Sequence, residues 1–174
     1  MKSFHADPAI KKKYLARVRA HQAADELIKG AYWENGKGCA IGCTIHSDEH
    51  EAYEIELGIP QMLAQLEDKI FEGSSNEWSK SWPGRFLESI PIGVDLSKVG
   101  WKFQHWLLLD PKDGVIRFAK DEDKEIFKTI GGLIWDLAIG KSISASAALG
   151  AESAALGAES AALRAAESVA LITI

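Results

Sequence analysis

The stretch PQMLAQLEDKIFEG, residues 60–73, indicates most directly which fold class the chain adopts. Its apolar residues recur at steps of three and four, the spacing that places side chains on one face of an α-helix. Proline suits the first turn of a helix and glycine commonly follows the last turn, so both ends of the stretch agree with this interpretation. The stretch therefore predicts an amphipathic helix whose apolar face consists of Met62, Leu63, Leu66, Ile70 and Phe71.

Segments on both sides of this stretch show the same helical spacing. Asp7-Pro8 is a good helix start, and Asp48 with Glu51 resembles a capping box. Pro83 is expected to interrupt one segment, and residues 115–118 alone indicate a strand. Helices are predicted over 8–29, 48–57, 60–73, 75–90, 95–109 and 121–139. The prediction is an all-α fold, in which about six helices form one compact globular domain over residues 1–140.

Six tryptophans in 174 residues indicate a core built on large aromatic side chains. In the helix predicted over 95–109, Trp106 lies on the same face as Phe103 and beside Leu107. This face is expected to point into the core.

The C-terminal tail, residues 141–174, differs in kind from the rest of the chain. AALGAES occurs at 147–153 and again at 154–160, and AALRAAES follows at 161–168. Leu149, Leu156 and Leu163 are therefore seven residues apart, as the d positions of a coiled coil are. Alanine favours helix, whereas each of two glycines inside the tail costs about 1 kcal/mol. The prediction is a C-terminal Ala-rich helix that packs on the body or on a second copy.

Composition and charge exclude several classes of protein. The net charge is −5, and residues 38–140 carry ten Lys/Arg against eighteen Asp/Glu, so a nucleic-acid partner is not expected. Without a run of about 18 apolar residues or a signal peptide, we expect a cytoplasmic protein with no membrane span. Two cysteines four positions apart do not form a disulfide framework, so reduced thiols are expected.

WENGKGCAIGCTIHSDEH, residues 33–50, concentrates the reactive side chains of the chain. Cys39, Cys43, His46 and His50 follow one another at steps of four, three and four, and thiolate and imidazole are preferred zinc ligands. On one continuous helix the first and last of them would lie about 16 Å apart, too far for one ion. Zinc would then need a neighbouring pair with further ligands, or a helix break at residue 42 or 47. Alternatively the cysteines pack as small apolar residues, in which case no cofactor is expected.

The segment also offers two catalytic alternatives. His46 to His50 spells H-x-x-E-H, in which Glu49 would activate a zinc-bound water, with Glu122 or Glu125 as the distant ligand. Proteases with this motif are much larger α/β proteins. The second alternative is a nucleophilic thiol at Cys39, near the start of a helix. The general base would be His105, oriented by Asp110.

Gly36, Lys37 and Gly38 form an anion-binding candidate, since loop amides and a lysine before a helix attract anions. A Walker motif is excluded, because five residues rather than four separate Gly30 from Gly36 and no hydroxyl follows the lysine. A weaker anion site remains as an expectation.

Much of residues 1–100 resembles a family of uncharacterised bacterial and phage-borne proteins. The resemblance lies in WENGKGCAIGCTIH (33–46), ELGIP (56–60), LAQLEDKIFEG (63–73), RFLESIPIGVDL (85–96) and the opening 2–30. Proteins of this family also carry Ala/Ser/Glu-rich tails. The resemblance implies no reaction and therefore no catalytic residue, and it implies an accessory role, such as a phage or mobile-element function.

Taken together, the sequence favours a non-enzymatic helical binding or interaction protein of accessory type. A protein partner or self-association is expected. The alternative is a small metal-dependent or cysteine-dependent enzyme with its site at residues 36–50.

Overall fold

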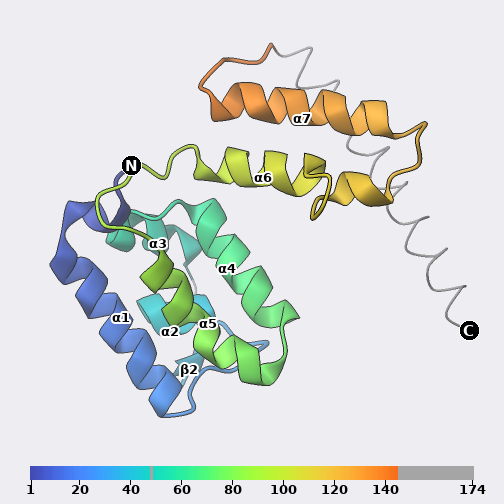
Figure 1. The fold of residues 1–174 in the computed structure, drawn as a ribbon. Coiled ribbons are helices and arrows are strands. Elements are labelled where there is room, and N and C mark those ends of the chain that lie inside the picture. Colours follow the sequence, from blue (N-terminus) through green and yellow to red (C-terminus); the bar gives the residue numbers. More distant parts are fainter. Residues whose placement is uncertain (48, 145–174) are drawn as a thin grey trace, which may run out of the picture. The chain divides into compact units, whose positions relative to one another are not determined.

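The computed structural model describes residues 1–47 and 49–144 of the chain (Figure 1). This part of the chain is mostly helical and contains one short antiparallel ribbon, so the predicted all-α fold is confirmed. It divides into two compact units between Ser97 and Lys98. None of the described helices is long and apolar enough to span a bilayer.

The first unit is built around one short helix, α2 (Ala40–Ile45), whose six residues are all buried. Four longer helices contact α2 and surround it (Figure 1). A 3₁₀ turn, η1, precedes them, and the strands β1 and β2 lead into α2. The bounds are η1 Ser3–Ala6, α1 Pro8–Ala23, β1 Trp33–Glu34, β2 Lys37–Gly38, α3 His50–Leu57, α4 Gln61–Gly73 and α5 Asn76–Ser89.

Helix α1 begins as predicted but ends earlier. The Asp7 carboxylate accepts a 2.8 Å hydrogen bond from the Ala9 amide, and Pro8 occupies the first helical position. The helix stops at Ala23, not just before Gly30, because Asp25 adopts a left-handed φ of 57°. The chain then pairs Leu27 with the strand residue Gly38, so an apolar spacing that resembled helix belongs to an extended segment.

Helices α3 and α4 end close to their predicted positions, and α5 differs from its prediction. Gly58 follows α3 with φ 62°, and α4 covers Gln61–Gly73. Helix α5 continues through Pro83, which was expected to interrupt it. Proline gives up one backbone hydrogen bond in a helix. Here Pro83 is buried, as are Phe86 and Leu87 of the same helix, so the proline is part of the packed side of α5.

The second unit is a helical hairpin of α6 (Val99–Leu109) and α7 (Lys124–Ala138), joined through the 3₁₀ helix η2 (Val115–Phe118). The strand expected at residues 115–118 is therefore wrong, because these residues form a 3₁₀ helix. Gly131 lets the two helices approach closely, since a Cβ there would lie 2.3 Å from Leu109 Cδ1. His105 Nδ1 hydrogen-bonds the Gly131 carbonyl at 3.0 Å, and its ring contacts that of Trp135.

The expectation for Trp106 is wrong. Its side chain is 43% exposed, Leu107 is 40% exposed, and α6 contains no fully buried residue. One domain was predicted over residues 1–140, whereas the structure divides this range into two compact units after Ser97. The predicted tail helix lies, from residue 145 on, outside the described residues.

Candidate functional site

The anion-binding candidate forms the turn and second strand of a tight hairpin. Asn35 and Gly36 both have positive φ, 52° and 82°, as a two-residue hairpin turn requires. Trp33 pairs with Gly38 across the ribbon. The Gly38 amide donates to the Glu26 carbonyl at 3.1 Å, and so is not available to an anion. The exposed Lys37 remains as the cationic group of this candidate.

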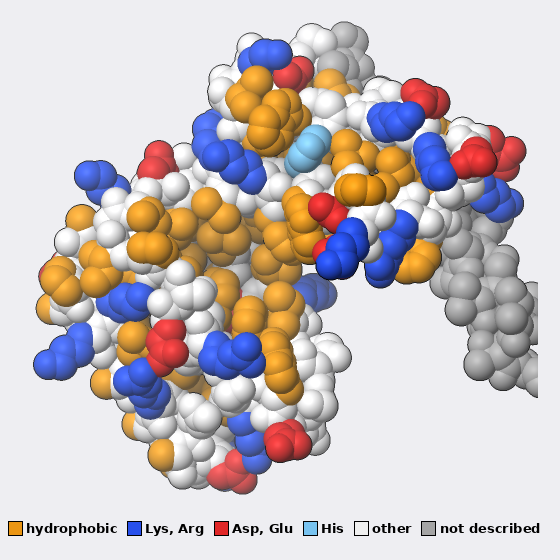
Figure 2. All heavy atoms as spheres, viewed as in Figure 1, with side chains coloured by type: hydrophobic (Ala, Val, Ile, Leu, Met, Phe, Trp, Pro, Cys, Tyr) orange, Lys and Arg blue, Asp and Glu red, His pale blue; other side chains and the backbone are white. Residues whose placement is uncertain are grey.

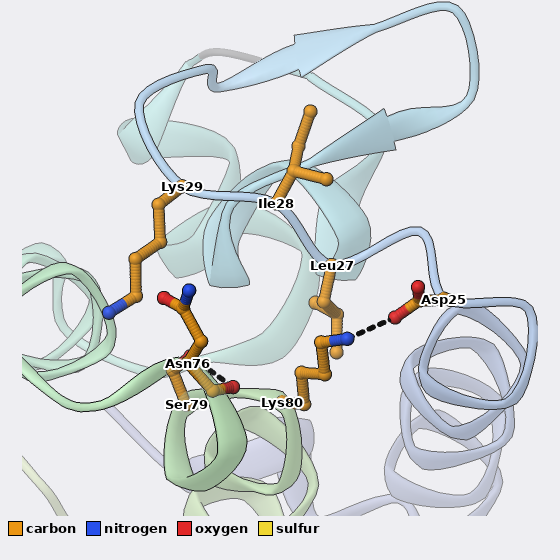
Figure 3. A pocket seen from close by; sticks show the side chains of 7 residues that line it. All are labelled: Asp25, Leu27, Ile28, Lys29, Asn76, Ser79 and Lys80. Atoms are coloured by element: carbon orange, nitrogen blue, oxygen red, sulfur yellow. Dashed lines mark hydrogen bonds and ion pairs between the residues drawn. The ribbon is translucent and has the colours of Figure 1, made fainter.

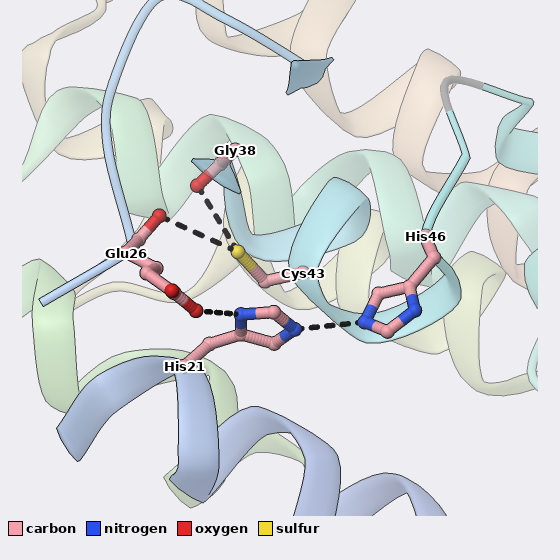
Figure 4. Close-up of polar contacts among 5 residues, drawn as sticks. All are labelled: His21, Glu26, Gly38, Cys43 and His46. Atoms are coloured by element: carbon pink, nitrogen blue, oxygen red, sulfur yellow. Dashed lines mark hydrogen bonds and ion pairs between the residues drawn. The ribbon is translucent and has the colours of Figure 1, made fainter. Parts of the chain in front are cut away.

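Both cysteines lie in the core. Cys39 precedes α2 and Cys43 lies within it, and each is at most 1% exposed. The Cys43 thiol points to the carbonyls of Gly38 and Glu26, at 3.4 and 3.7 Å (Figure 4). Burial raises the pKa of Cys43 to about 12. Burial and a hydrogen bond with Asp68 also raise the pKa of Cys39 well above its usual range. Neutral thiols of this kind pack as small apolar side chains.

The base and orienting residue that the sequence suggested for Cys39 make contacts within the second unit. His105 belongs to the second unit, where it bonds the Gly131 carbonyl. Asp110 accepts hydrogen bonds from two backbone amides of the following turn. Glu49, the candidate base of the separate H-x-x-E-H alternative, is exposed just before α3. This geometry does not support an activated thiolate.

We expect both thiols to react slowly with a disulfide reagent such as dithionitrobenzoate in native protein. Burial and raised pKa values keep the thiolate fraction of Cys39 and Cys43 small at pH 7. Unfolding in guanidinium should accelerate labelling by several orders of magnitude. Rapid labelling of Cys39 alone in native protein would contradict the packed arrangement.

The structure brings together a cluster that the sequence did not suggest, made of Glu26, His21, His46 and Trp33. Helix α2 ends at His46, which follows its last residue with a left-handed φ of 57°. The Nε2 atoms of His46 and His21 lie 2.7 Å apart, and His21 Nδ1 lies 2.6 Å from a Glu26 carboxylate oxygen (Figure 4). The Trp33 ring stacks on His46 with a centroid distance of 4.5 Å.

These contacts form a chain of three titratable groups. A carboxylate only accepts, so His21 Nδ1–H donates to Glu26, and a single proton is shared between the two Nε2 atoms. Burial and the nearby Arg17 cation lower the pKa of His46. Two hydrogen bonds thus link the exposed His46 ring through His21 to Glu26. His21 lies 25 residues before His46, and its place on the apolar face of α1 was its only sequence signal.

Zinc stays a prediction. Within residues 1–47 and 49–144 no group of three or more His, Cys, Asp or Glu side chains is arranged to hold a metal ion. Cys39 and Cys43 lie in the core and His46 lies on the surface. The His50 side chain lies outside the described residues, as does the full H-x-x-E-H motif.

A buried pair of polar side chains, Tyr53 and Glu67, joins α3 and α4. The Tyr53 hydroxyl donates to Glu67 at 2.5 Å, and both side chains are fully buried. Burial raises the pKa of Glu67 to about 8. The other Glu67 carboxylate oxygen and one Asp68 oxygen have no hydrogen-bond partner. Sequence spacing placed Glu67 on a helix without indicating that it faces the core.

A cavity of about 290 Å³ lies between the loop after α1 and the first turns of α5 (Figure 3). Lys80 pairs with Asp25, which lowers the pKa of that carboxyl group, and Lys29 Nζ donates to the Ser74 carbonyl. Two ammonium groups against one carboxylate favour an anion over a cation. The lining residues are Asp25, Leu27, Ile28, Lys29, Asn76, Ser79 and Lys80.

The second unit exposes many large apolar side chains, and Figure 2 shows apolar patches among its charged side chains. Of its described apolar side chains, only Phe127 and Ala138 are fully buried. Soluble proteins seldom leave large contiguous apolar patches exposed unless a partner covers them. The large apolar side chains that are at least 36% exposed in this unit are Val99, Trp101, Trp106, Leu107, Val115, Phe118, Trp135 and Ile139.

The chain was compared with family models, curated proteins and solved structures. None of the three comparisons finds a match. Function is therefore inferred from the contacts, burial and charge of the described residues.

Proposed function

We propose that this protein is a non-enzymatic interaction protein that binds a helical segment of a protein partner through the outer face of α6. The observation that carries the proposal is the exposed apolar surface of the second unit. We call Val99, Phe103, Trp106 and Leu107 the α6 stripe. Its members stand at steps of four, three and one, which places them on one side of the helix.

The α6 stripe lies apart from the contact with α7. His105 and Leu109 of α6 face Gly131 of α7, and helical periodicity sets these two residues at a large angle from the stripe. Helix α6 is therefore apolar on two sides, which is typical of a helix buried on both sides. The hairpin supplies a partner for one side only.

The composition of the stripe suits protein recognition. Trp106 and Phe103 are in contact, with ring centroids 5.9 Å apart, and aromatic residues supply much of the binding energy at protein interfaces. An apolar row at helical spacing fits the groove or face of another helix. Small-molecule sites are instead concave, and the cavity beside Lys29 lies in the other unit.

The enzymatic alternative has less support. A cysteine nucleophile is disfavoured by the buried, neutral thiols of Cys39 and Cys43. The Glu26–His21–His46 chain is a hydrogen-bonded set of acid–base side chains, but none of the three residues lines the cavity beside Lys29. An accessory role is compatible with a small binding protein and remains part of the proposal.

Replacing Trp106 with lysine should abolish partner binding and leave the fold intact. Because the side chain is 43% exposed, the free energy of unfolding should fall by less than about 1 kcal/mol. A partner captured by the immobilised full chain would be identified by mass spectrometry, purified and titrated against both proteins. Its Kd should rise about 30-fold or more, as expected for an interface anchor.

Thr129→Lys is the matched control, since Thr129 is exposed on α7 and the substitution adds the same charge. It should bind the purified partner with unchanged Kd. Equal binding by the Trp106→Lys variant would show that the α6 stripe is not the docking surface.

A further inference from the structure

We propose that residues 145–174 of this chain pack as a helix along α7 and complete a three-helix bundle with α6. The surface that receives them is a second apolar row, Ile126, Ile130, Leu133 and Leu137, here called the α7 stripe. This inference goes beyond the proposed function, because it assigns an occupant to a different face and leaves the α6 stripe open to a partner.

The α7 stripe has the spacing of a coiled-coil seam. Its residues follow at steps of four, three and four, which is the alternation of a and d positions in a heptad. All four side chains are only partly buried. The side of α7 that contacts α6 instead carries Phe127 and Gly131, which are buried. The stripe is therefore an apolar row that the described structure leaves only half-buried.

The length and position of the tail make it the nearest occupant. Residue 145 follows the last residue of α7, Ala138, after a short connection in which Gly140 adopts φ 86°. A left-handed glycine just after a helix ends it and turns the chain. Thirty residues span about 45 Å as a helix, against about 22 Å for α7, so the tail is long enough to run back along the whole stripe.

The period of the tail matches that of the stripe. Leu149, Leu156 and Leu163 are seven residues apart, so a helical tail would present one leucine per heptad on a single side. The remaining positions are mainly Ala, Ser and Gly. Small residues on one helix leave room for the large Ile and Leu side chains of the other, and alternating sizes give a well-packed interface.

Neither part is stable as an apolar helix alone. An Ala-rich helix with internal glycines is marginal in water, and a hairpin that fully buries two apolar side chains has almost no core. Joining them within one chain avoids the entropy of association, because the short connection gives a high effective concentration. This advantage favours the chain's own tail over that of a second copy.

Hydrogen–deuterium exchange of the full chain, read by mass spectrometry, tests the proposal. The test variant is Leu156→Lys with Leu163→Lys, which places two charges in the expected seam. The control is Ala158→Lys with Ala165→Lys, which adds the same charges about half a turn away. Amides of residues 124–138 should exchange at least about tenfold faster in the test variant, with wild-type rates in the control. Residues 40–45 of the first unit serve as the unchanged internal reference.

Three outcomes would overturn the proposal. Exchange over 124–138 that is fast in all three proteins, or slow in all three, would show that the tail does not cover the stripe. Protection that appears only at high protein concentration, together with a dimeric mass by light scattering, would assign the stripe to a second copy. The Trp106→Lys variant should leave exchange over 124–138 unchanged, so failure here is separable from failure of the proposed docking surface.

Discussion

Replacing Gly42 with alanine is expected to unfold the first unit. A Cβ at this position would lie 1.6 Å from the carbonyl oxygen of Tyr32 and 2.6 Å from its carbonyl carbon. Both atoms are backbone, and the Tyr32 carbonyl is held by the Cys39 amide at 3.1 Å. Relief requires moving the segment that leads into β1 away from α2, the helix on which the core is built. The cost should exceed about 4 kcal/mol, comparable with the whole stability of a small domain.

Gly84→Ala is the matched control. Gly84 also lies inside a helix, α5, but a Cβ there meets no atom within 4 Å. Alanine has the higher helix propensity, so this variant should gain up to about 1 kcal/mol. Urea unfolding followed by far-ultraviolet circular dichroism would measure both effects. A Gly42→Ala protein that unfolds at the wild-type midpoint would refute the close approach of Tyr32 to α2.

Stability should fall as the pH rises from about 4.5 to about 8, because of Glu67. Burial raises the pKa of its carboxyl group from the ordinary 4.5 to about 8 in the folded protein. Between these values the folded state keeps a proton that the unfolded state releases, so its stabilising contribution is lost through this range. At about 1.4 kcal/mol per pH unit, the loss is on the order of 5 kcal/mol.

Glu67→Gln should remove most of this pH dependence. The amide has the shape of the protonated acid and still offers an oxygen to the Tyr53 hydroxyl, which donates to Glu67 at 2.5 Å. The variant should therefore unfold at higher urea concentration than wild type at pH 8.5 and at a similar concentration at pH 5. Unfolding curves at five pH values would measure the difference. Identical pH profiles for the two proteins would mean that Glu67 is ionised in the fold.

Part of the candidate site was predictable from the spacing of residues and part was not. The burial of Cys39 and Cys43 agrees with one of the alternatives that the sequence left open, in which they pack as small apolar residues. The partner of His46 was not predictable. His21 lies on another helix, and nothing local indicates that the two imidazoles meet. The close contact of Gly42 with Tyr32 was equally hidden, since a loop glycine and a packing glycine look alike in sequence.

Trp106 shows a second limit of sequence reasoning. Helical spacing correctly placed Phe103, Trp106 and Leu107 on one side of a helix. It did not reveal whether that side meets a core, a partner or solvent, because an apolar face has the same pattern in all three settings. The structure shows Trp106 and Leu107 exposed, while His105 on another side of the helix contacts α7.

The sequence by itself determined the fold class and most of the helix ends. These depend on interactions within one or two turns: apolar spacing in α4, the Asp7 cap of α1, the left-handed Gly58 after α3. Tertiary structure decided where α1 stops, since Leu27 pairs with Gly38 instead of extending the helix. It also decided that α5 runs through Pro83, that Glu67 is buried and that His21 meets His46. Each of these outcomes balances a local preference against contacts with residues distant in sequence, and only the folded chain brings those contacts into being.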